Sequence, residues 1–306
     1  MEINSPLTNK TGTKLIREIQ VIHLVNEWKN AFSIDISAEM KGHKTISEYQ
    51  CDTTGLYFFM PDDVDGSAFF YEALQHFDWY YMPEKWEHQI TLKKLNPASK
   101  ILEVGCAEGA FIELCIKNGH EATGIELNKN AVLKAKQKGL SVYEKDLHAL
   151  ASEKENFYDC VCSFQVLEHI SKPKEFIDSC IKLLKPGGKL IFCVPNSDGL
   201  LATDYSLLDM PPHHMTRWNK RTFKNLETLF KINLISTHFE PLAKYHWDWY
   251  LSLVRNKKIS YKLLRKIFSD AVASKVFKGF LSIGFNKFIN GHTIYVEFIK
   301  RKETES

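Results

Sequence analysis

The stretch Ile101-Leu102-Glu103-Val104-Gly105-Cys106-Ala107-Glu108-Gly109 carries the strongest fold signal in this chain. Its apolar start predicts a buried strand, and the glycines that follow turn the chain into a helix that we expect to begin near Ala110. Glycine tolerates positive φ and lets the backbone approach a ligand closely, while the first turn of a helix offers unpaired N–H groups. The sequence therefore predicts a nucleotide-binding turn at the end of this strand.

The spacing of the small residues in this turn narrows the choice of ligand. A dinucleotide fingerprint places glycines at relative positions one, three and six, whereas Gly105 and Gly109 are separated by three residues that include Ala107. NAD is therefore disfavoured. Glu103 followed by small residues at 105, 107 and 109 resembles the first motif of the class I S-adenosylmethionine (SAM)-dependent methyltransferases, with alanine in place of the middle glycine. The resemblance implies SAM as the cofactor.

The composition bounds the class of protein. The 306 residues are 44% hydrophobic, which suffices for a full core. The formal net charge of +3 is too small to indicate nucleic acid as a partner. Neither a membrane span nor a secretory signal is visible, so we expect a cytoplasmic protein. The seven cysteines include no Cys-x-x-Cys pair, and we expect them to be reduced core residues.

The order of the patterns predicts the architecture. Between Ser99 and Asn196, β-rich runs alternate with helical patterns, which is typical of a doubly wound, mostly parallel α/β sheet. The expected strands are Lys100–Val104, Glu121–Glu126, Ser141–Glu144, Tyr158–Phe164 and Lys189–Val194. Pro186-Gly187-Gly188 is expected to stop the helix before the last of these. With later strands at 234–239 and 292–299, the resemblance implies a seven-stranded Rossmann-like methyltransferase sheet.

We expect three regions along the chain. Residues 1–98 would form an N-terminal helical cap, with helical patterns around 14–32 and 66–95 and a small strand and turn segment between them. Residues 99–240 would form the SAM-binding methyltransferase core. Residues 241–306 would supply a basic amphipathic helical insertion and a final strand that completes the core.

The resemblance assigns further cofactor contacts. Glu126 ends the second strand, where an acid can bind both ribose hydroxyls, and Leu127 follows it; the alternative is a solvated glutamate. Asp146 resembles the family's adenine-binding acid, with Leu147 against the ring; the alternative is an ordinary turn aspartate. Glu103 resembles the acid that holds the methionine ammonium group.

The segment Phe157–Ile170 (Phe-Tyr-Asp-Cys-Val-Cys-Ser-Phe-Gln-Val-Leu-Glu-His-Ile) closely resembles the subgroup that contains the ubiquinone and menaquinone biosynthesis methyltransferases. The resemblance covers residues 99–199 and implies that Gln165 faces the methionine part of SAM. Some quinone O-methyltransferases carry a divalent-metal site, Glu-x-x-Glu-His, at this position, whereas this chain has Gln165, Glu168 and His169. Because a hard cation prefers carboxylate oxygen, we predict no required metal, and the glutamate and histidine would shape the pocket or serve as caps.

The loop 209–218, Asp-Met-Pro-Pro-His-His-Met-Thr-Arg-Trp, is the candidate lid and acceptor wall. Methyl transfer to a hydroxyl needs alignment of the acceptor and removal of a proton, and histidine titrates in the useful range. His213, His214 and His169 are therefore the candidate catalytic residues. The alternative is that a loop histidine packs on the neighbouring tryptophan or binds a backbone carbonyl. Arg217 would hold an acidic acceptor group or form a surface salt bridge.

Residues 255–288 hold nine lysines and arginines against one acid, Asp270, with apolar residues at helical spacing. This pattern predicts a basic amphipathic helix pair that makes peripheral contact with an anionic membrane surface. The alternative is a helical cap whose apolar stripe packs on the sheet and whose lysines are solvated.

The functional hypothesis follows from these residues together. The whole chain, including Tyr80-Tyr81, the segment Lys85-Trp86-Glu87-His88 and the Pro-Pro-His-His loop, resembles bacterial methyltransferases of small molecules or cell-surface glycans. We expect methyl transfer from SAM to such an acceptor, on oxygen. The alternative is a catalytically inactive SAM-binding scaffold or interaction protein, which only Ala107 supports. Ser163-Phe164-Gln165-Val166 replaces the Asn/Asp-Pro-Pro-Tyr/Phe motif of DNA base methyltransferases, so base methylation is not expected.

Overall fold

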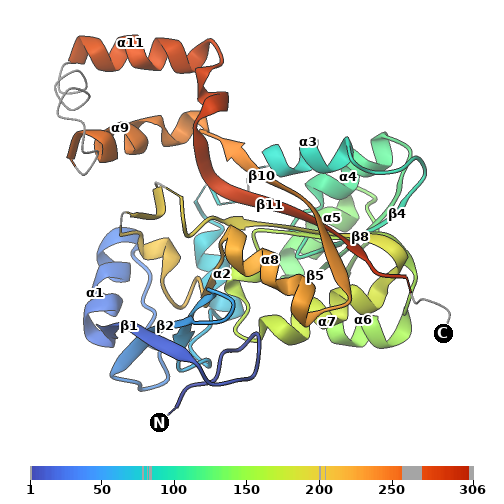
Figure 1. Cartoon of the computed structure of the whole chain (residues 1–306), viewed down its shortest axis with the longest axis horizontal. Helices are drawn as coiled ribbons and strands as arrows, with labels where there is room; N and C mark the ends of the chain where they lie inside the picture. The colour runs from blue at the N-terminus through green and yellow to red at the C-terminus, as the bar shows by residue number, and fades with distance from the viewer. Residues whose placement is uncertain are drawn as a thin grey trace.

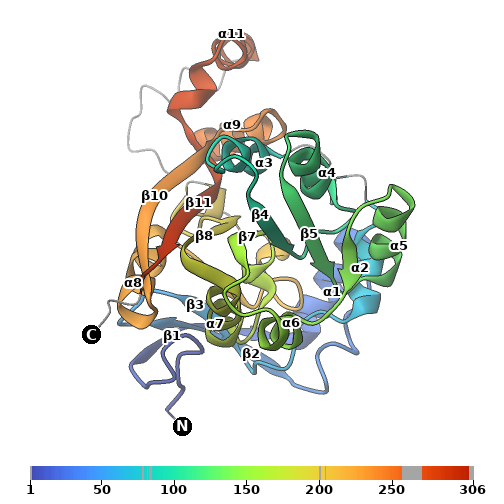
Figure 2. The same ribbon diagram turned by 90° about the vertical axis from the view of Figure 1, so that its right-hand side faces the viewer.

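A seven-stranded sheet forms the centre of the structure (Figures 1 and 2). The computed structural model describes residues 2–77, 79–80, 82, 85–199, 201–203, 205–256 and 271–302. The strands follow the spatial order β10-β11-β8-β7-β4-β5-β6. Their bounds are β4 Lys100–Val104, β5 Glu121–Glu126, β6 Val142–Glu144, β7 Tyr158–Phe164, β8 Leu184–Pro195, β10 Ile232–Pro241 and β11 Asn290–Lys300. Strands β4 to β8 are parallel, while β11 is antiparallel to both β8 and β10, which confirms the doubly wound α/β fold.

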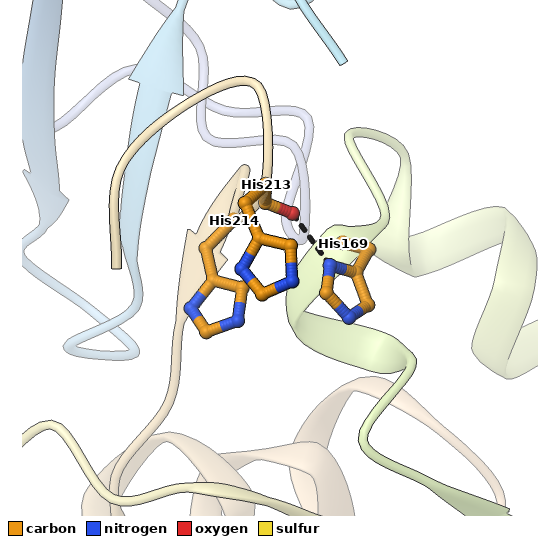
Figure 3. A group of neighbouring side chains, drawn as sticks. All are labelled: His169, His213 and His214. Carbon is orange, nitrogen blue, oxygen red and sulfur yellow. Dashed lines mark hydrogen bonds between the residues drawn. The ribbon is translucent and has the colours of Figure 1, made fainter. Parts of the chain in front are cut away.

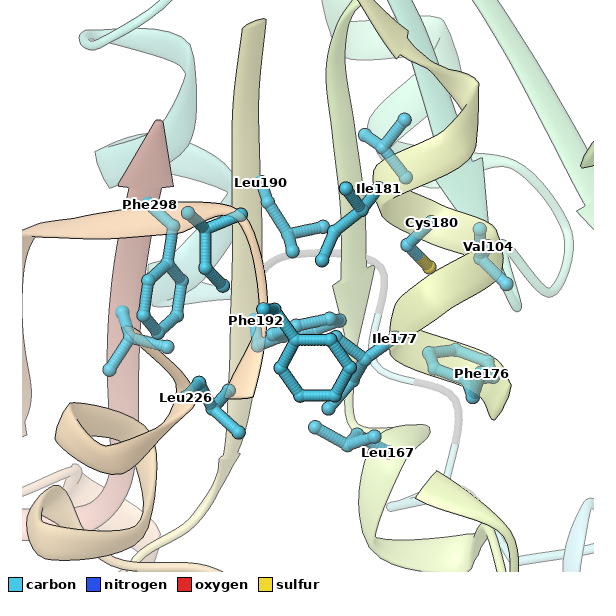
Figure 4. Packing of buried hydrophobic residues seen from close by; sticks show 14 of the residues in the cluster. Val104, Leu167, Phe176, Ile177, Cys180, Ile181, Leu190, Phe192, Leu226 and Phe298 are labelled. Carbon is cyan, nitrogen blue, oxygen red and sulfur yellow. The ribbon is translucent and has the colours of Figure 1, made fainter. Parts of the chain in front are cut away.

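Helices cover both faces of this sheet (Figure 2). One face carries α3 (Trp86–Leu92), α4 (Ala110–Lys117) and α5 (Lys129–Gln137), and the other carries α6 (Leu147–Glu153), α7 (Pro173–Leu183) and α8 (Lys220–Leu229). Successive strand residues point to opposite faces, so Leu190 and Phe192 join the α6–α8 core while Ile191 joins the other. Figure 4 shows Phe192 against Ile177 of α7 in the first of these cores.

A second, antiparallel sheet forms beside the first from β1 (Thr13–Gln20), β2 (Thr45–Cys51), β3 (Tyr57–Met60) and β9 (Thr216–Arg217). The expected helix over 14–32 is therefore wrong in its first part, because the chain up to Gln20 pairs with β2. Helix α1 begins only at Val21 (α1, Val21–Phe32), where buried residues start to recur at helical spacing. The N-terminal segment thus has more strand than its composition indicated.

Two other expected elements differ in their bounds. The helical pattern over 66–95 divides into α2 (Ala68–Leu74) and α3. Helix α7 already ends at Leu183, and Pro186-Gly187-Gly188 lies inside β8, where the register with β7 shifts. The shift explains how a proline and two glycines fit a strand, because a bulge relaxes the ladder locally.

The loop after β8 connects the two sheets. Met210 and Met215 belong to the core formed by α1, α2 and the second sheet. The N–H of Met215 donates to the carbonyl of Glu168 (2.8 Å) in the 3₁₀ turn η1 (Leu167–His169). Glu48 of β2 is almost fully buried and binds both Arg17 (2.6 Å) and Arg217 (3.0 Å). Arg217 therefore belongs to an internal ion pair rather than a surface salt bridge, and these contacts hold the loop against η1.

A helical hairpin projects from the edge of the sheet between β10 and β11 (Figure 1). It consists of α9 (Trp247–Asn256) and α11 (Ala271–Ser282), whose Leu253 and Leu281 share a small core. Residues 257–270, which carry about half of the predicted basic and apolar pattern, lie outside the described residues. Membrane contact through 255–288 stays a prediction. Within the described residues, none of the helices has the length and apolar character needed to cross a bilayer.

The remaining 3₁₀ turns are η2 Leu201–Thr203, η3 Leu207–Asp209, η4 Lys244–His246 and η5 Phe285–Phe288.

Candidate active site

The turn between β4 and α4 is held in a conformation that only small residues allow. Gly105 (φ 76°) and Gly109 (φ 80°) both lie in the left-handed region. A Cβ at Gly105 would come within 2.4 Å of Val166, and one at Gly109 within 2.7 Å of Leu140. Both glycines are therefore required by backbone conformation and by packing.

Ala107, the alanine in the middle of the motif, also has a positive φ of 46°. An L-residue pays a free-energy cost in this region that glycine avoids. The N–H of Ala107 donates to Oε2 of Glu126 (3.0 Å), which compensates part of this cost. Alanine at this position therefore strains the turn, but the backbone keeps the conformation that glycine would adopt.

Glu126 lies opposite this turn at the end of β5. Its second oxygen accepts the N–H of Asn128 (2.8 Å), so both carboxylate oxygens are held by backbone groups. Each oxygen retains capacity for another hydrogen bond, and ribose hydroxyls are suitable donors. Leu127 beside it is 71% exposed, which leaves an apolar side chain free to contact a bound ring.

Asp146 and Leu147 are placed differently from Glu126 and Leu127. Oδ1 of Asp146 caps α6 by accepting the N–H of Ala149 (2.9 Å), and Oδ2 remains for a ligand. Leu147 is buried in the core on the α6 side of the sheet. The structural role expected for a turn aspartate is thus present, and the leucine faces the core rather than an open surface.

Glu103 is buried at the carboxyl end of β4, and its Oε2 has no hydrogen-bond partner among the described residues. Burial raises the pKa of Glu103 to about 8, against an opposing effect of Lys85. Gln165, at the end of β7, has a positive φ of 56° and donates its amide to Glu87 of α3 at 3.4 Å. The orphaned carboxylate oxygen fits the ammonium group of a SAM methionine, because such an oxygen needs a cationic donor.

Three histidines meet between η1 and the loop after β8 (Figure 3). Ring centroids of His169 and His213 are 4.6 Å apart, and those of His213 and His214 are 4.5 Å apart. Burial lowers the pKa of His169 to about 3 and that of His213 well below its ordinary value, with the neighbouring His214 as a further cause for both. These two imidazoles are therefore neutral near pH 7.

Asp209 orients one of these rings. Its Oδ1 lies 3.3 Å from Nδ1 of His214, and both side chains are buried. Burial acts to raise the pKa of Asp209, but the hydrogen bond and charge of His214 outweigh it and hold the pKa at about 2. A carboxylate bound to one imidazole nitrogen leaves the other available as a base.

A small cavity of about 10 Å³ adjoins this pair. Its walls include Glu168, Ser197, His214 and His292 at the carboxyl ends of β7 and β8 and the start of β11. Burial raises the pKa of Glu168 to about 8, and its Oε2 lacks a partner among the described residues, as does Oγ of Ser197. The cavity thus offers unpaired polar atoms beside the histidines.

Comparison with known proteins identifies the family of this chain. Residues 78–261 match a family model described as a methyltransferase domain. This chain belongs to that family. A ubiquinone biosynthesis O-methyltransferase from Psychrobacter arcticus is 28% identical over 199 residues, covering 58% of this chain and 75% of the relative. One from Coxiella burnetii is 33% identical over 179 residues, covering 51% and 72%.

Among solved structures, a SAM-dependent methyltransferase from Archaeoglobus fulgidus matches with a TM-score of 0.46 and 19% identity, over 70% of this chain and 94% of that one. The protein is a SAM-dependent methyltransferase, and the glycine turn and orphaned Glu103 oxygen fit its cofactor. The sequence did not single out Asp209 as a partner of the histidines, or Glu87 as a neighbour of Gln165. Only the fold brings these residues to the site.

We expect Ala107→Gly to stabilise the methyltransferase by up to about 1 kcal/mol. Left-handed backbone costs an L-residue roughly 1–2 kcal/mol, and the greater freedom of glycine in the unfolded chain offsets part of the gain. The control Ala149→Gly, at an exposed position of α6, should destabilise by roughly 0.5–1 kcal/mol. Denaturant unfolding measures both, and equal destabilisation by the two substitutions would contradict the strain at Ala107.

The raised pKa of Glu103 predicts a pH-dependent affinity for SAM. An ammonium group beside Glu103 favours its charged form, so binding below pH 8 releases the proton that the free protein holds, and affinity rises with pH by at most about tenfold per unit. We expect this rise between pH 6 and 7.5. Calorimetry in buffers of different ionisation enthalpy measures it.

Glu103→Gln should bind SAM more weakly and without this proton release. The control is Glu108→Gln in the same turn, whose carboxylate faces Lys134 and Lys138. Proton release that persists in Glu103→Gln would show that another group is responsible.

Proposed function

We propose that this methyltransferase transfers the methyl group of SAM to a hydroxyl oxygen of a small-molecule or glycan acceptor. The observation that carries the proposal is the buried Asp209–His214 pair beside the small cavity at the carboxyl ends of β7 and β8. Ligands of open α/β sheets bind at this edge. Relatives named as O-methyltransferases of ubiquinone biosynthesis support oxygen as the methylated atom.

In this proposal the cofactor lies along the carboxyl edge of the sheet. The cofactor would lie close to the backbone of the turn that contains Gly105, Ala107 and Gly109, because small residues allow such an approach. Glu103 and Gln165 would contact the methionine part, and Glu126 the ribose. Asp146, Leu127 and Leu147 remain the candidates for the adenine, and of the two leucines Leu127 has the exposed side chain.

The Asp209–His214 pair supplies the proton acceptor in the proposed reaction. The acceptor oxygen attacks the methyl carbon in line with the leaving sulfur, the C–S bond breaks with its electron pair going to sulfur, and the hydroxyl proton moves to Nε2 of His214. Asp209 accepts the Nδ1–H and stabilises the imidazolium that forms. His169 and His213 would line the path of the acceptor, and their neutral state avoids repulsion of the sulfonium.

We expect His214→Ala to lower the rate of methyl transfer by about 10²–10⁴-fold, the usual range for removal of a general base, with SAM affinity unchanged. The assay follows radiolabelled methyl transfer from SAM to a panel of ortho-diphenols and monosaccharides. The control is His43→Ala, an exposed histidine paired with Asp63 far along the chain from the site.

Two results would contradict the proposal. Full activity in His214→Ala would exclude His214 as the base. Tight SAM binding by the wild-type protein without methylation of either acceptor class would favour the alternative of a SAM-binding scaffold, for which the strained Ala107 is the structural support.

A further inference from the structure

We propose that His169, His213 and His214 form a binding site for a divalent transition metal, for which Zn²⁺ is the best match. One ring nitrogen from each residue lies within 4.8 Å of the others. Figure 3 shows the three rings gathered between η1 and the loop after β8. Two separate segments of chain therefore bring three nitrogen donors to one point.

The hydrogen bonds of these rings prepare them as ligands. Nδ1 of His169 lies 2.5 Å from the carbonyl oxygen of His213, and Nδ1 of His213 lies 2.7 Å from that of Leu208. A carbonyl only accepts, so Nδ1 carries the proton in both rings. The carboxylate of Asp209 favours the same tautomer in His214. Each ring therefore presents the lone pair of Nε2, the arrangement in which metal-binding histidines donate their other N–H to a carbonyl or carboxylate.

The nitrogens need only a small movement to bind one ion. Zinc–nitrogen bonds of about 2.0–2.1 Å in tetrahedral geometry place ligand nitrogens roughly 3.4 Å apart, against the 4.8 Å limit found here. The hydroxyl of Tyr80, 3.3 Å from Nε2 of His213, occupies one side of this space. Metal binding at that nitrogen would replace the contact with Tyr80.

The donor set determines the kind of ion. Three neutral imidazoles suit zinc and other nitrogen-preferring metals better than Mg²⁺ or Ca²⁺. Three protein ligands also leave a fourth position open, as in catalytic zinc sites. The sequence-based prediction that no metal is required rested on Gln165, Glu168 and His169 alone. In the structure, His213 and His214 lie beside His169.

A metal here would deepen the proposed function, on which this one step rests. An acceptor hydroxyl bound at the open position would release its proton to water more readily, and His214 would then hold the ion rather than accept the proton. The metal site itself requires no assumption about the reaction.

The test is titration of the untagged, metal-stripped full chain with Zn²⁺ by calorimetry, and with Co²⁺ by visible absorbance. We expect one equivalent to bind, with intense tetrahedral Co²⁺ bands. His169→Ala, His213→Ala and His214→Ala should each weaken binding by at least about tenfold. Tyr80→Phe should retain or tighten it, and the exposed His43→Ala should leave it unchanged.

Asp209→Asn keeps all three ligands and should weaken Zn²⁺ binding by about 10–100-fold, which guards against loss of a ligand that simply unfolds the protein. Binding that none of the site variants affects, or absence of stoichiometric binding in the wild type, would overturn the proposal. Methyl transfer that persists in the metal-free protein would also leave His214 as the base. Metal binding without methyl transfer would support the site and count against the proposed function.

Discussion

The carboxylate of Glu126 joins two turns of backbone at the carboxyl edge of the sheet, and the proposed cofactor site depends on it. One oxygen holds the N–H of Ala107, in the turn after β4, and the other holds the N–H of Asn128 at the start of α5. Adjacent parallel strands end at the same edge, so a single side chain can organise both. The strained φ of Ala107 persists because this bond and the packing of the flanking glycines define the turn.

The acceptor side of the site depends on the second sheet. Glu48 binds an arginine from β1 and another from β9, and β9 directly follows the histidine loop. Met210 and Met215 anchor the same loop in the N-terminal core. The N-terminal segment thus contributes to the proposed reaction by positioning the histidine loop. It fixes the loop that carries His213 and His214 against His169 of η1, the turn that follows β7 of the main sheet.

The site contains several carboxyl groups whose burial opposes their charge. Glu103 and Glu168 have pKa values near 8, and each has an oxygen without a partner among the described residues. Such groups cost stability when ionised alone. A cationic cofactor would supply the missing counter-charge, so binding and protonation are coupled in this account.

The sequence predicted the main sheet well, because buried parallel strands and the glycine turn leave strong local patterns. β4, β5 and β7 begin and end where the alternation of apolar runs placed them. β1 was missed because its pairing with β2 is a tertiary contact that overrides a helix-like pattern. For the same reason the approach of Asp209 to His214, and of both loop histidines to His169, could not be read from spacing along the chain. The candidate residues themselves came from motif resemblance, and their roles remain predictions.

Calorimetric titration with SAM and S-adenosylhomocysteine would show whether the turn closed by Glu126 binds SAM. Glu126→Gln retains one side-chain oxygen that can accept a backbone N–H, but it cannot accept hydrogen bonds from both backbone turns and from a ribose. We expect binding by the wild type, a loss of affinity of about tenfold or more in Glu126→Gln, and unchanged affinity in Glu108→Gln. Absence of binding by the wild type, or equal affinity of wild type and Glu126→Gln, would contradict this expectation.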